Sequence, residues 1–144
     1  MLVSQILKSK GEGGVISLKT GATVSEAAAI LSEKRIGTVV ISDDGETPDG
    51  ILSERDIVRE LGRRGAGCMS DKVSDLMTAK LVTCTESDSA DQVLELMTAG
   101  RFRHLPVMQG ERMIGLISIG DVVKARLAEL SMEKDALQGM IMGH

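Results

Sequence analysis

Residues 50–56 read Gly-Ile-Leu-Ser-Glu-Arg-Asp, and the pattern returns at residues 115–121 as Gly-Leu-Ile-Ser-Ile-Gly-Asp. In both places a Ser stands three positions after the Gly, an Asp stands three positions after the Ser, and an apolar helical run follows. An internal repeat is interpreted first because it sets the architecture of the whole chain. The repeated unit here is a group of polar side chains where a predicted strand meets a predicted helix.

The repeat extends upstream, where Thr23 and Ser89 lie 66 residues apart. Glu26 and Gln92 follow them by three positions, and apolar residues then recur at spacings of three and four. This pattern predicts a capping box at the start of an amphipathic helix in each copy. Each copy therefore predicts a strand, a capped helix, a hairpin of two strands and a second helix. The predicted strands before the turns lie at 15–18, 36–41, 81–84 and 102–107, with hairpin turns at 42–49 and 108–113.

The length of 144 residues allows one domain or two small ones. Each copy has about 50 residues, a size at which a separate core is marginal, so we expect the copies to bury their apolar faces against each other. We predict a first repeat at residues 1–66, which includes a short lead-in helix, a second repeat at 67–127 and a helical tail at 128–144. Residues 62–71 are expected to form an exposed, Gly-rich linker.

Composition excludes several classes of protein. A net charge of −4 argues against a nucleic-acid-binding surface, where a basic stripe is expected. No apolar stretch approaches the length of about 18 residues that indicates a membrane span, and no leader pattern opens the chain. Cys68 and Cys84 give no disulfide framework and no zinc ligand cluster, so we expect a cytoplasmic location. Cys84 is predicted to be buried, Cys68 to be exposed, and Lys8 and Lys10 to be solvated.

The Ser-x-x-Asp pattern has two interpretations. As a capping box it only starts a helix, and such boxes are common. As a binding site, the N–H groups of the helix N-terminus and the Ser hydroxyl suit a phosphate, whereas the Asp carboxylate suits two sugar hydroxyls. The two aligned copies favour the second interpretation, because each also has a Gly that a helix cap alone does not require.

The whole arrangement resembles a cystathionine-β-synthase (CBS) domain pair, also called a Bateman module. Both copies match the family's nucleotide motif Gly-h-x-(Ser/Thr)-x-x-Asp in full. A second family signature, Phe-Arg-His-Leu-Pro-Val at 102–107, precedes the second hairpin, whereas the first copy departs from it at 36–41 and has no Pro. The resemblance covers about residues 1–127.

The resemblance implies an α+β fold of two β-α-β-β-α repeats with pseudo-two-fold symmetry and two clefts. It implies a regulatory module rather than an enzyme, with an adenosine ligand such as AMP, ADP, ATP, S-adenosylmethionine or NADH. It further implies a homodimer and an unidentified regulated protein on another chain. No metal site and no catalytic residue are expected.

In the family, each cleft takes its Ser and Asp from one repeat and holds the base with early strands of the other. Carried over to this chain, cleft A has Ser53, Arg55, Asp56, Val82, Thr83, Phe102, Arg103, His104, Leu105 and Pro106. Cleft B has Ser118, Gly120, Asp121, Ile16, Ser17, Ile36, Gly37, Thr38 and Val39.

The clefts are expected to differ in charge, because cleft A gathers Arg55, Arg103 and His104, whereas cleft B has Gly120 and Gly37 at matching positions. Arg binds phosphate through charge-assisted hydrogen bonds, so cleft A is expected to prefer phosphorylated adenosine. The sequence also allows that these side chains do not bind phosphate. Arg55 and Arg103 are then solvated or ion-paired, and His104 is an ordinary strand residue.

Three other functions compete with an adenylate sensor. One is a module for S-adenosylmethionine or NADH, which shares the ribose carboxylate but needs less phosphate binding. Another is an interaction scaffold with vestigial clefts, against which the intact Ser and Asp argue. The third is a small nucleotide hydrolase, but the sequence has no Walker-type loop and no nucleophile–base pair.

Overall fold

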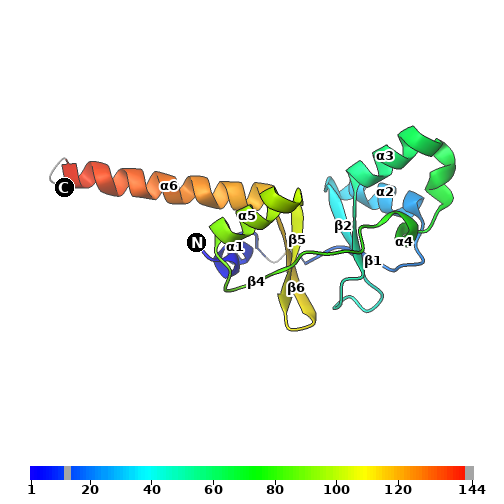
Figure 1. The fold of residues 1–144 in the computed structure, drawn as a ribbon, viewed down its shortest axis with the longest axis horizontal. Coiled ribbons are helices and arrows are strands. Elements are labelled where there is room, and N and C mark those ends of the chain that lie inside the picture. The colour runs from blue at the N-terminus through cyan, green and yellow to red at the C-terminus, as the bar shows by residue number, and fades with distance from the viewer. Residues whose placement is uncertain (12–13, 142–144) are drawn as a thin grey trace. The chain divides into compact units, whose positions relative to one another are not determined.

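The structure is a computed structural model and describes residues 1–11 and 14–141. Its helices and strands alternate in the same order in the two halves of the chain (Figure 1). The helices are α1 (Val3–Ser9), α2 (Val24–Lys34), α3 (Glu54–Arg64), α4 (Val73–Leu76), α5 (Ala90–Gly100) and α6 (Ile119–Ile141), with a 3₁₀ helix η1 (Ala66–Ser70). The strands are β1 (Ser17–Leu18), β2 (Thr38–Ile41), β3 (Gly50–Ser53), β4 (Cys84–Thr85), β5 (His104–Gln109) and β6 (Arg112–Ser118).

The two sheets have the same topology. In the order β1-β2-β3 and β4-β5-β6, a short first strand pairs in parallel with the second. The loop that leads back to the third strand is residues 42–49 in the first sheet and a tight turn at 110–111 in the second. The capping boxes predicted at Thr23 and Ser89 are present, with the side chain of each accepting a hydrogen bond from the N–H of Glu26 or Gln92. The predicted α+β fold with two β-α-β-β-α repeats is confirmed.

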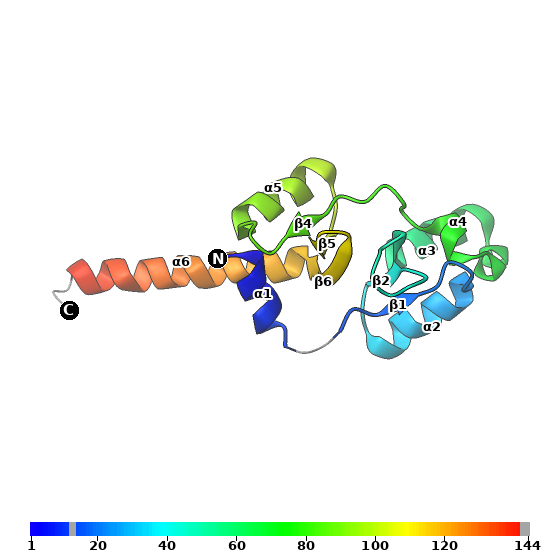
Figure 2. The same cartoon turned by 90° about the horizontal axis from the view of Figure 1, so that it is seen from below.

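The chain divides into two compact units. The helix α1, which precedes the first repeat, lies in the unit of the second repeat, and α4, which precedes the second repeat, lies in the unit of the first. We call α1 and α4 the lead-in helices. The first-repeat unit comprises residues 14–81 and 109–114 and contains α4; the second-repeat unit comprises residues 1–13, 82–108 and 115–144 and contains α1. Equivalent backbone bridges hold the two helices in place, Leu2 with Ser89 and Lys72 with Thr23. α1 is thus anchored at the start of α5, far along the chain, as Figure 2 shows. The repeat boundaries at residues 66 and 127 stay a prediction.

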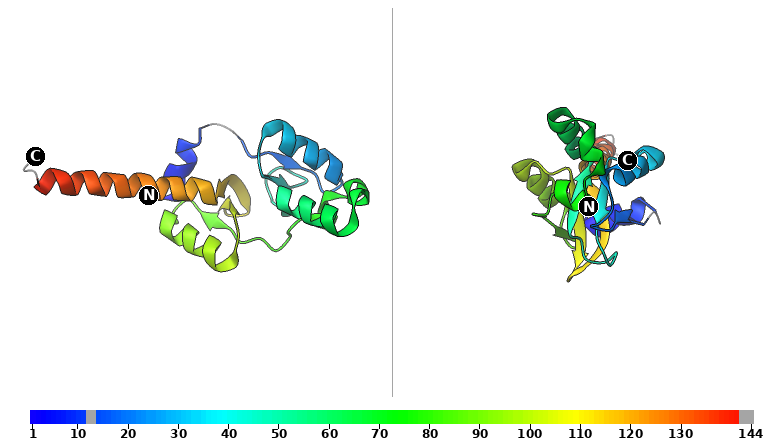
Figure 3. Two further views of the ribbon diagram at one scale, coloured as in Figure 1. Left: turned by 90° about the horizontal axis from the view of Figure 1, so that it is seen from above. Right: turned by 90° about the vertical axis from the view of Figure 1, so that its right-hand side faces the viewer.

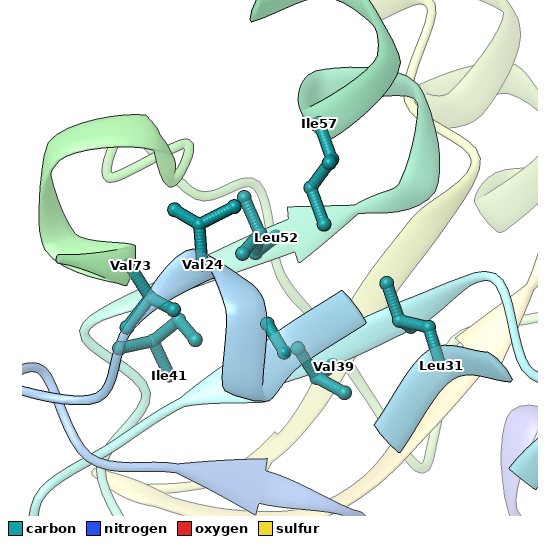
Figure 4. Packing of buried hydrophobic residues seen from close by; sticks show 8 residues of the cluster. Val24, Leu31, Val39, Ile41, Leu52, Ile57 and Val73 are labelled. Atoms are coloured by element: carbon teal, nitrogen blue, oxygen red, sulfur yellow. The ribbon is translucent and has the colours of Figure 1, made fainter. Parts of the chain in front are cut away.

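The core of the first-repeat unit is aliphatic, as the composition predicts. The apolar face of α2 packs on β2, β3 and the start of α3 (Figure 4). The three- and four-residue spacing along α2 places these side chains on one face of the helix. The buried members of this cluster are Val24, Ala27, Leu31, Val39, Ile41, Leu52, Ile57 and Val73.

The prediction that residues 62–71 form a linker is wrong, although most of these residues are exposed, as predicted. α3 continues to Arg64, Gly65 ends it at φ +78°, and η1 follows at once. Arg64 is ion-paired with both Glu60 and Asp71, which holds the turn against the end of α3. Cys68 is fully buried, so the prediction of an exposed thiol is also wrong.

The tail is helical, as predicted, and α6 extends beyond Gln138 to Ile141. Met142 and His144 lie outside the described residues. Cys84 is buried as predicted, and burial, with a smaller contribution from the charge of Asp88, raises the pKa of its thiol to about 12. Within residues 1–11 and 14–141, no helix combines the length and apolar character needed to cross a bilayer.

Candidate functional site

The first Ser-x-x-Asp motif forms a complete capping box at the start of α3. The Oγ of Ser53 accepts a hydrogen bond from the N–H of Asp56 at 3.2 Å. In return, Oδ2 of Asp56 accepts hydrogen bonds from the N–H and the hydroxyl of Ser53, both at 3.0 Å. The other carboxylate oxygen, Oδ1, is paired at 3.6 Å with Arg59, whose side chain is 72% exposed. This site therefore presents a well-oriented carboxylate with an exposed cation at the long end of ion-pair distance.

The second motif repeats this geometry at the start of α6. The N–H of Asp121 donates to Oγ of Ser118 at 3.0 Å, and the N–H of Ser118 donates to Oδ2 of Asp121 at 2.9 Å. The same Oδ2 lies 2.8 Å from Nζ of Lys10, which also donates to the carbonyl of Leu116 at 2.8 Å. Lys10 comes from the segment after α1, so the packing of α1 in this unit delivers a cation to the second motif.

Burial, the Lys10 contact and the hydrogen bonds from Ser118 together shift the pKa of Asp121. Burial is the largest single influence and raises the pKa of this carboxyl, but hydrogen bonds from Lys10 and from Ser118 outweigh it. The pKa of Asp121 is consequently below its ordinary value. The ion pair stabilises the fold at pH values above the ordinary pKa of Asp, and this contribution is lost as the pH falls through the lowered pKa.

Substitution of Lys10 tests this pairing. In Lys10→Met, burial acts on Asp121 without its nearest cation, so we expect the pKa of Asp121 to rise relative to the native protein. The stability difference between the two proteins should be largest near neutral pH and should shrink in acid. Carboxyl-detected NMR titration of Asp121 and urea unfolding at both pH values measure these effects. Lys8→Met, two residues away, is the control, and an equal pKa change in both variants would contradict the assignment.

His104 lies in the same electrostatic environment. Burial lowers the pKa of its imidazole, the charges of Lys10 and Arg103 lower it further, and Asp121 acts in the opposite direction. The strand that carries it is tied to α6, because the N–H of Ile119 donates to the carbonyl of Arg103 at 2.8 Å. Around Asp121, the second-repeat unit thus gathers a lysine and a histidine that is held neutral over a wider pH range than usual.

An equivalent backbone contact exists in the first-repeat unit, where the N–H of Glu54 donates to the carbonyl of Gly37 at 2.9 Å. With the bond to the Ser, two of the about four unpaired N–H groups at each helix N-terminus therefore have partners in the protein. This reduces what the helix end alone can offer to a phosphate. The carboxylate and the cations nearby are the stronger recognition groups.

The motif glycines have a packing role. A Cβ at Gly50 would lie 3.0 Å from the carbonyl oxygen of Thr78 and closer still to the side chain of Met77. A Cβ at Gly115 would lie 2.9 Å from the side chain of Leu7 in α1. Each glycine thus leaves room for a segment of its own unit: the residues just after α4 approach Gly50, and Leu7 of α1 approaches Gly115. A helix cap alone does not require a glycine at this position of the motif. The close approach of the packed segment requires one, so the glycine is no evidence for a ligand.

The residues predicted for each cleft are divided between the two units. Ser53, Arg55 and Asp56 of cleft A lie in the first-repeat unit, and its remaining residues lie in the second-repeat unit; cleft B is divided in the opposite sense. The exposed residues among them are Ser17, Arg55, Thr83, Arg103 and Gly120, and the buried ones are Thr38, Val39, Leu105 and Pro106. The half-buried ones are Ile16, Ile36, Gly37, Ser53, Asp56, Val82, Phe102, His104, Ser118 and Asp121. The membership of the two clefts stays a prediction.

Lys10 is a site residue that the sequence predicts only as a solvated side chain. Its contact with Asp121 joins residues that are far apart along the chain, and neither repeat pattern contains it. The only signal was its place just after a lead-in helix. Elsewhere, the described part of the chain has no group of three His, Cys, Asp or Glu side chains that could hold a metal ion.

Two repeats, each with a Ser–Asp cap at the carboxyl end of its last strand, define a paired-repeat module with two equivalent polar sites. The family model for the CBS domain matches residues 5–63 and 73–128. The chain therefore belongs to the CBS domain family, as its two motifs predict.

Comparisons with individual proteins agree with this assignment. The chain is 36% identical to the mitochondrial CBS domain-containing protein CBSX3 of Arabidopsis thaliana, over 98% of this chain and 72% of that protein. It is 41% identical to the CBS-domain protein ATU1752 of Agrobacterium tumefaciens, with a TM-score of 0.82 over 88% of this chain and 99% of that one. A third similar structure is the CBS domain protein PAE2072 of Pyrobaculum aerophilum in complex with AMP, with 26% identity, a TM-score of 0.77, and coverage of 92% and 99%.

Proposed function

We propose that the chain is a regulatory module that binds an adenosine nucleotide (AMP, ADP or ATP) and acts on a partner protein. The observation that carries this proposal is the pair of Ser–Asp caps, which leave one carboxylate oxygen outside the capping box in each unit. Such an oxygen can accept hydrogen bonds from ribose hydroxyls. The AMP complex of the similar Pyrobaculum protein supports the choice of ligand.

The mechanism that we propose is differential binding. A nucleotide shifts the equilibrium between two arrangements of the protein only if it binds one of them more tightly than the other. We propose that each cleft combines the Ser and Asp of one repeat with early strands of the other, so that ligand binding couples the two units. The regulated protein is then a separate chain that recognises one arrangement. We propose no catalytic role and a cytoplasmic location.

We also propose that the protein is a homodimer that associates through helices of its repeats. Large apolar side chains are exposed on these helices. Val58 and Leu61 on α3 are 64% and 36% exposed, and Leu96 on α5 is 39% exposed. Exposed apolar residues on the surface of helices are typical of an association surface.

A thermal-shift screen with AMP, ADP, ATP, S-adenosylmethionine, NADH and GMP tests the proposed ligand class. A ligand at about 100 times its dissociation constant stabilises the fold by roughly 2.7 kcal/mol. For a chain of this size we expect a rise in Tm of several degrees with adenylates and none with GMP. A shift with S-adenosylmethionine or NADH alone would favour that ligand class instead. If no compound shifts the Tm, the result favours an interaction scaffold. In a separate incubation with ATP, sustained release of a hydrolysis product would show that the protein is an enzyme.

A further inference from the structure

The helix α6 has two faces of different character. Near its start it packs against α5 and α1 of its own unit, where Val122 and Ala125 are buried. An ion pair of Arg126 with Asp91 at 2.9 Å, and one of the N-terminal amine with Glu129 at 3.0 Å, fix this part of the helix. The CBS family model ends at residue 128, whereas the helix continues to Ile141. It projects well past α1 and α5 (Figure 3).

A second apolar face, exposed for the most part, runs along α6 from Val123 to Ile141. We call it the tail stripe, and its positions alternate at spacings of four and three residues. At about 100° per residue, all six positions fall within an arc of about 80°. The members of the tail stripe are Val123 (41% exposed), Leu127 (62%), Leu130 (48%), Lys134, Leu137 (58%) and Ile141 (76%).

This spacing is that of a coiled-coil seam. Alternating steps of four and three residues define a heptad repeat, in which the apolar positions of one helix pack into holes on an identical partner. Leu127, Lys134 and Ile141 then occupy the a positions, and the other members occupy the d positions. The apolar face of a helix that packs on a globular core spans about 100° or more of the helix circumference, whereas the tail stripe spans about 80°.

The single polar member of the stripe indicates the orientation and the number of strands. A lysine at one a position specifies register and oligomeric state, at some cost in stability. In a parallel pair, Lys134 packs beside the partner's g position, which is Glu133 of the second copy, so two symmetric ion pairs offset the contact between the lysines. An antiparallel pair that aligns the same six layers would instead bring the two Glu133 side chains close together.

We propose that the tail stripe binds the tail stripe of a second copy of this chain in a parallel, two-stranded coiled coil. This inference deepens the proposed homodimer and gives it a second contact, which begins in the last helix of the second repeat and extends beyond it. It is independent of the ligand, because none of the six stripe residues belongs to either predicted cleft.

Cysteine cross-linking tests the contact and its orientation. Both native cysteines are buried, so an introduced cysteine is the reactive thiol. Under mild oxidation with diamide, Leu137→Cys should give a covalent dimer, because a d position faces its own copy across a parallel seam. Met132→Cys is the matched control: Met132 is 59% exposed but lies about half a turn round the helix from the stripe. Equal cross-linking of both variants, or none with Leu137→Cys, overturns the proposal.

Sedimentation analysis of the full chain measures the strength of the contact. The double variant Leu130→Glu, Leu137→Glu should raise the dimer dissociation constant at least tenfold, whereas Met132→Glu should leave it unchanged. Lys134→Glu should also weaken the dimer, and adding Glu133→Lys should restore it. A dissociation constant that none of these changes alters overturns the coiled coil. The AMP-induced thermal shift of the same variants tests the proposed function separately, and we expect it to persist.

Discussion

Replacement of Asp56 by Ala is expected to abolish most of the AMP-induced rise in Tm, and replacement of Asp121 to reduce it by less. The carboxylate is the group that we assign to the ribose hydroxyls, and removal of a partner leaves those hydroxyls unpaired in the complex. The two sites differ because Lys10, 2.8 Å from Oδ2 of Asp121, already neutralises part of the negative charge with which this carboxylate accepts hydrogen bonds. Asp56 is held only by the exposed Arg59 at 3.6 Å among the ion pairs of the described residues. Isothermal titration with AMP measures both affinities.

The control for this experiment comes from the chain's own symmetry. Glu26 and Gln92 occupy the same capping-box position in α2 and α5 as the two aspartates do in α3 and α6. Glu26→Ala and Gln92→Ala therefore weaken a helix start by a comparable amount and leave the proposed ligand groups intact. Equal losses of AMP affinity in Asp56→Ala and Asp121→Ala would contradict the proposed difference between the clefts. If Glu26→Ala and Gln92→Ala lose as much AMP affinity, the Ser–Asp motif acts only as a helix cap and not as a binding site.

Gly50→Val is expected to destabilise the fold by about 1–3 kcal/mol, the usual cost of overpacking a filled site. The new Cβ meets the carbonyl oxygen of Thr78, a backbone atom that cannot rotate away, so the segment after α4 has to move. Gly115→Val should cost less, because its neighbour is the flexible side chain of Leu7. Urea unfolding of the purified variants measures both effects.

Gly62→Ala is the matched control for this series. Gly62 lies within α3, and a Cβ there meets nothing within 4 Å. Alanine in a helix is favoured over glycine by about 0.5–1 kcal/mol, so this variant should be as stable as the native protein or more so. If Gly50→Val were equally stable, the close approach of the α4 segment would not be the reason for a glycine in the motif.

Much of the fold could be predicted because its signals are local. The capping boxes, the strand–helix alternation and the repeat offset are all written within short stretches of sequence, and the structure confirms them. The Ser–Asp geometry was equally local, since each pair lies within one helical turn. These features need no knowledge of what packs against them.

The features that the sequence did not reveal depend on contacts between distant segments. Lys10 meets Asp121 only because α1 packs in the second-repeat unit, and no periodicity marks that contact. The role of Gly50 depends in the same way on the segment after α4. Cys68 was expected to be exposed because its neighbours are glycines, but the turn of η1 places its thiol in the interior.

The exchange of lead-in helices also bears on how the protein is made. During synthesis α1 leaves the ribosome long before the backbone that it bridges, at Ser89, and before the side chain that Lys10 neutralises, Asp121. The helix α4, in contrast, follows its partner strands closely in the chain. The first-repeat unit can therefore assemble most of its core co-translationally, whereas the second-repeat unit closes only after α6 has begun to emerge. A gene fragment cut between the repeats would leave α1 in the piece that lacks its partner and would deprive the other piece of α1.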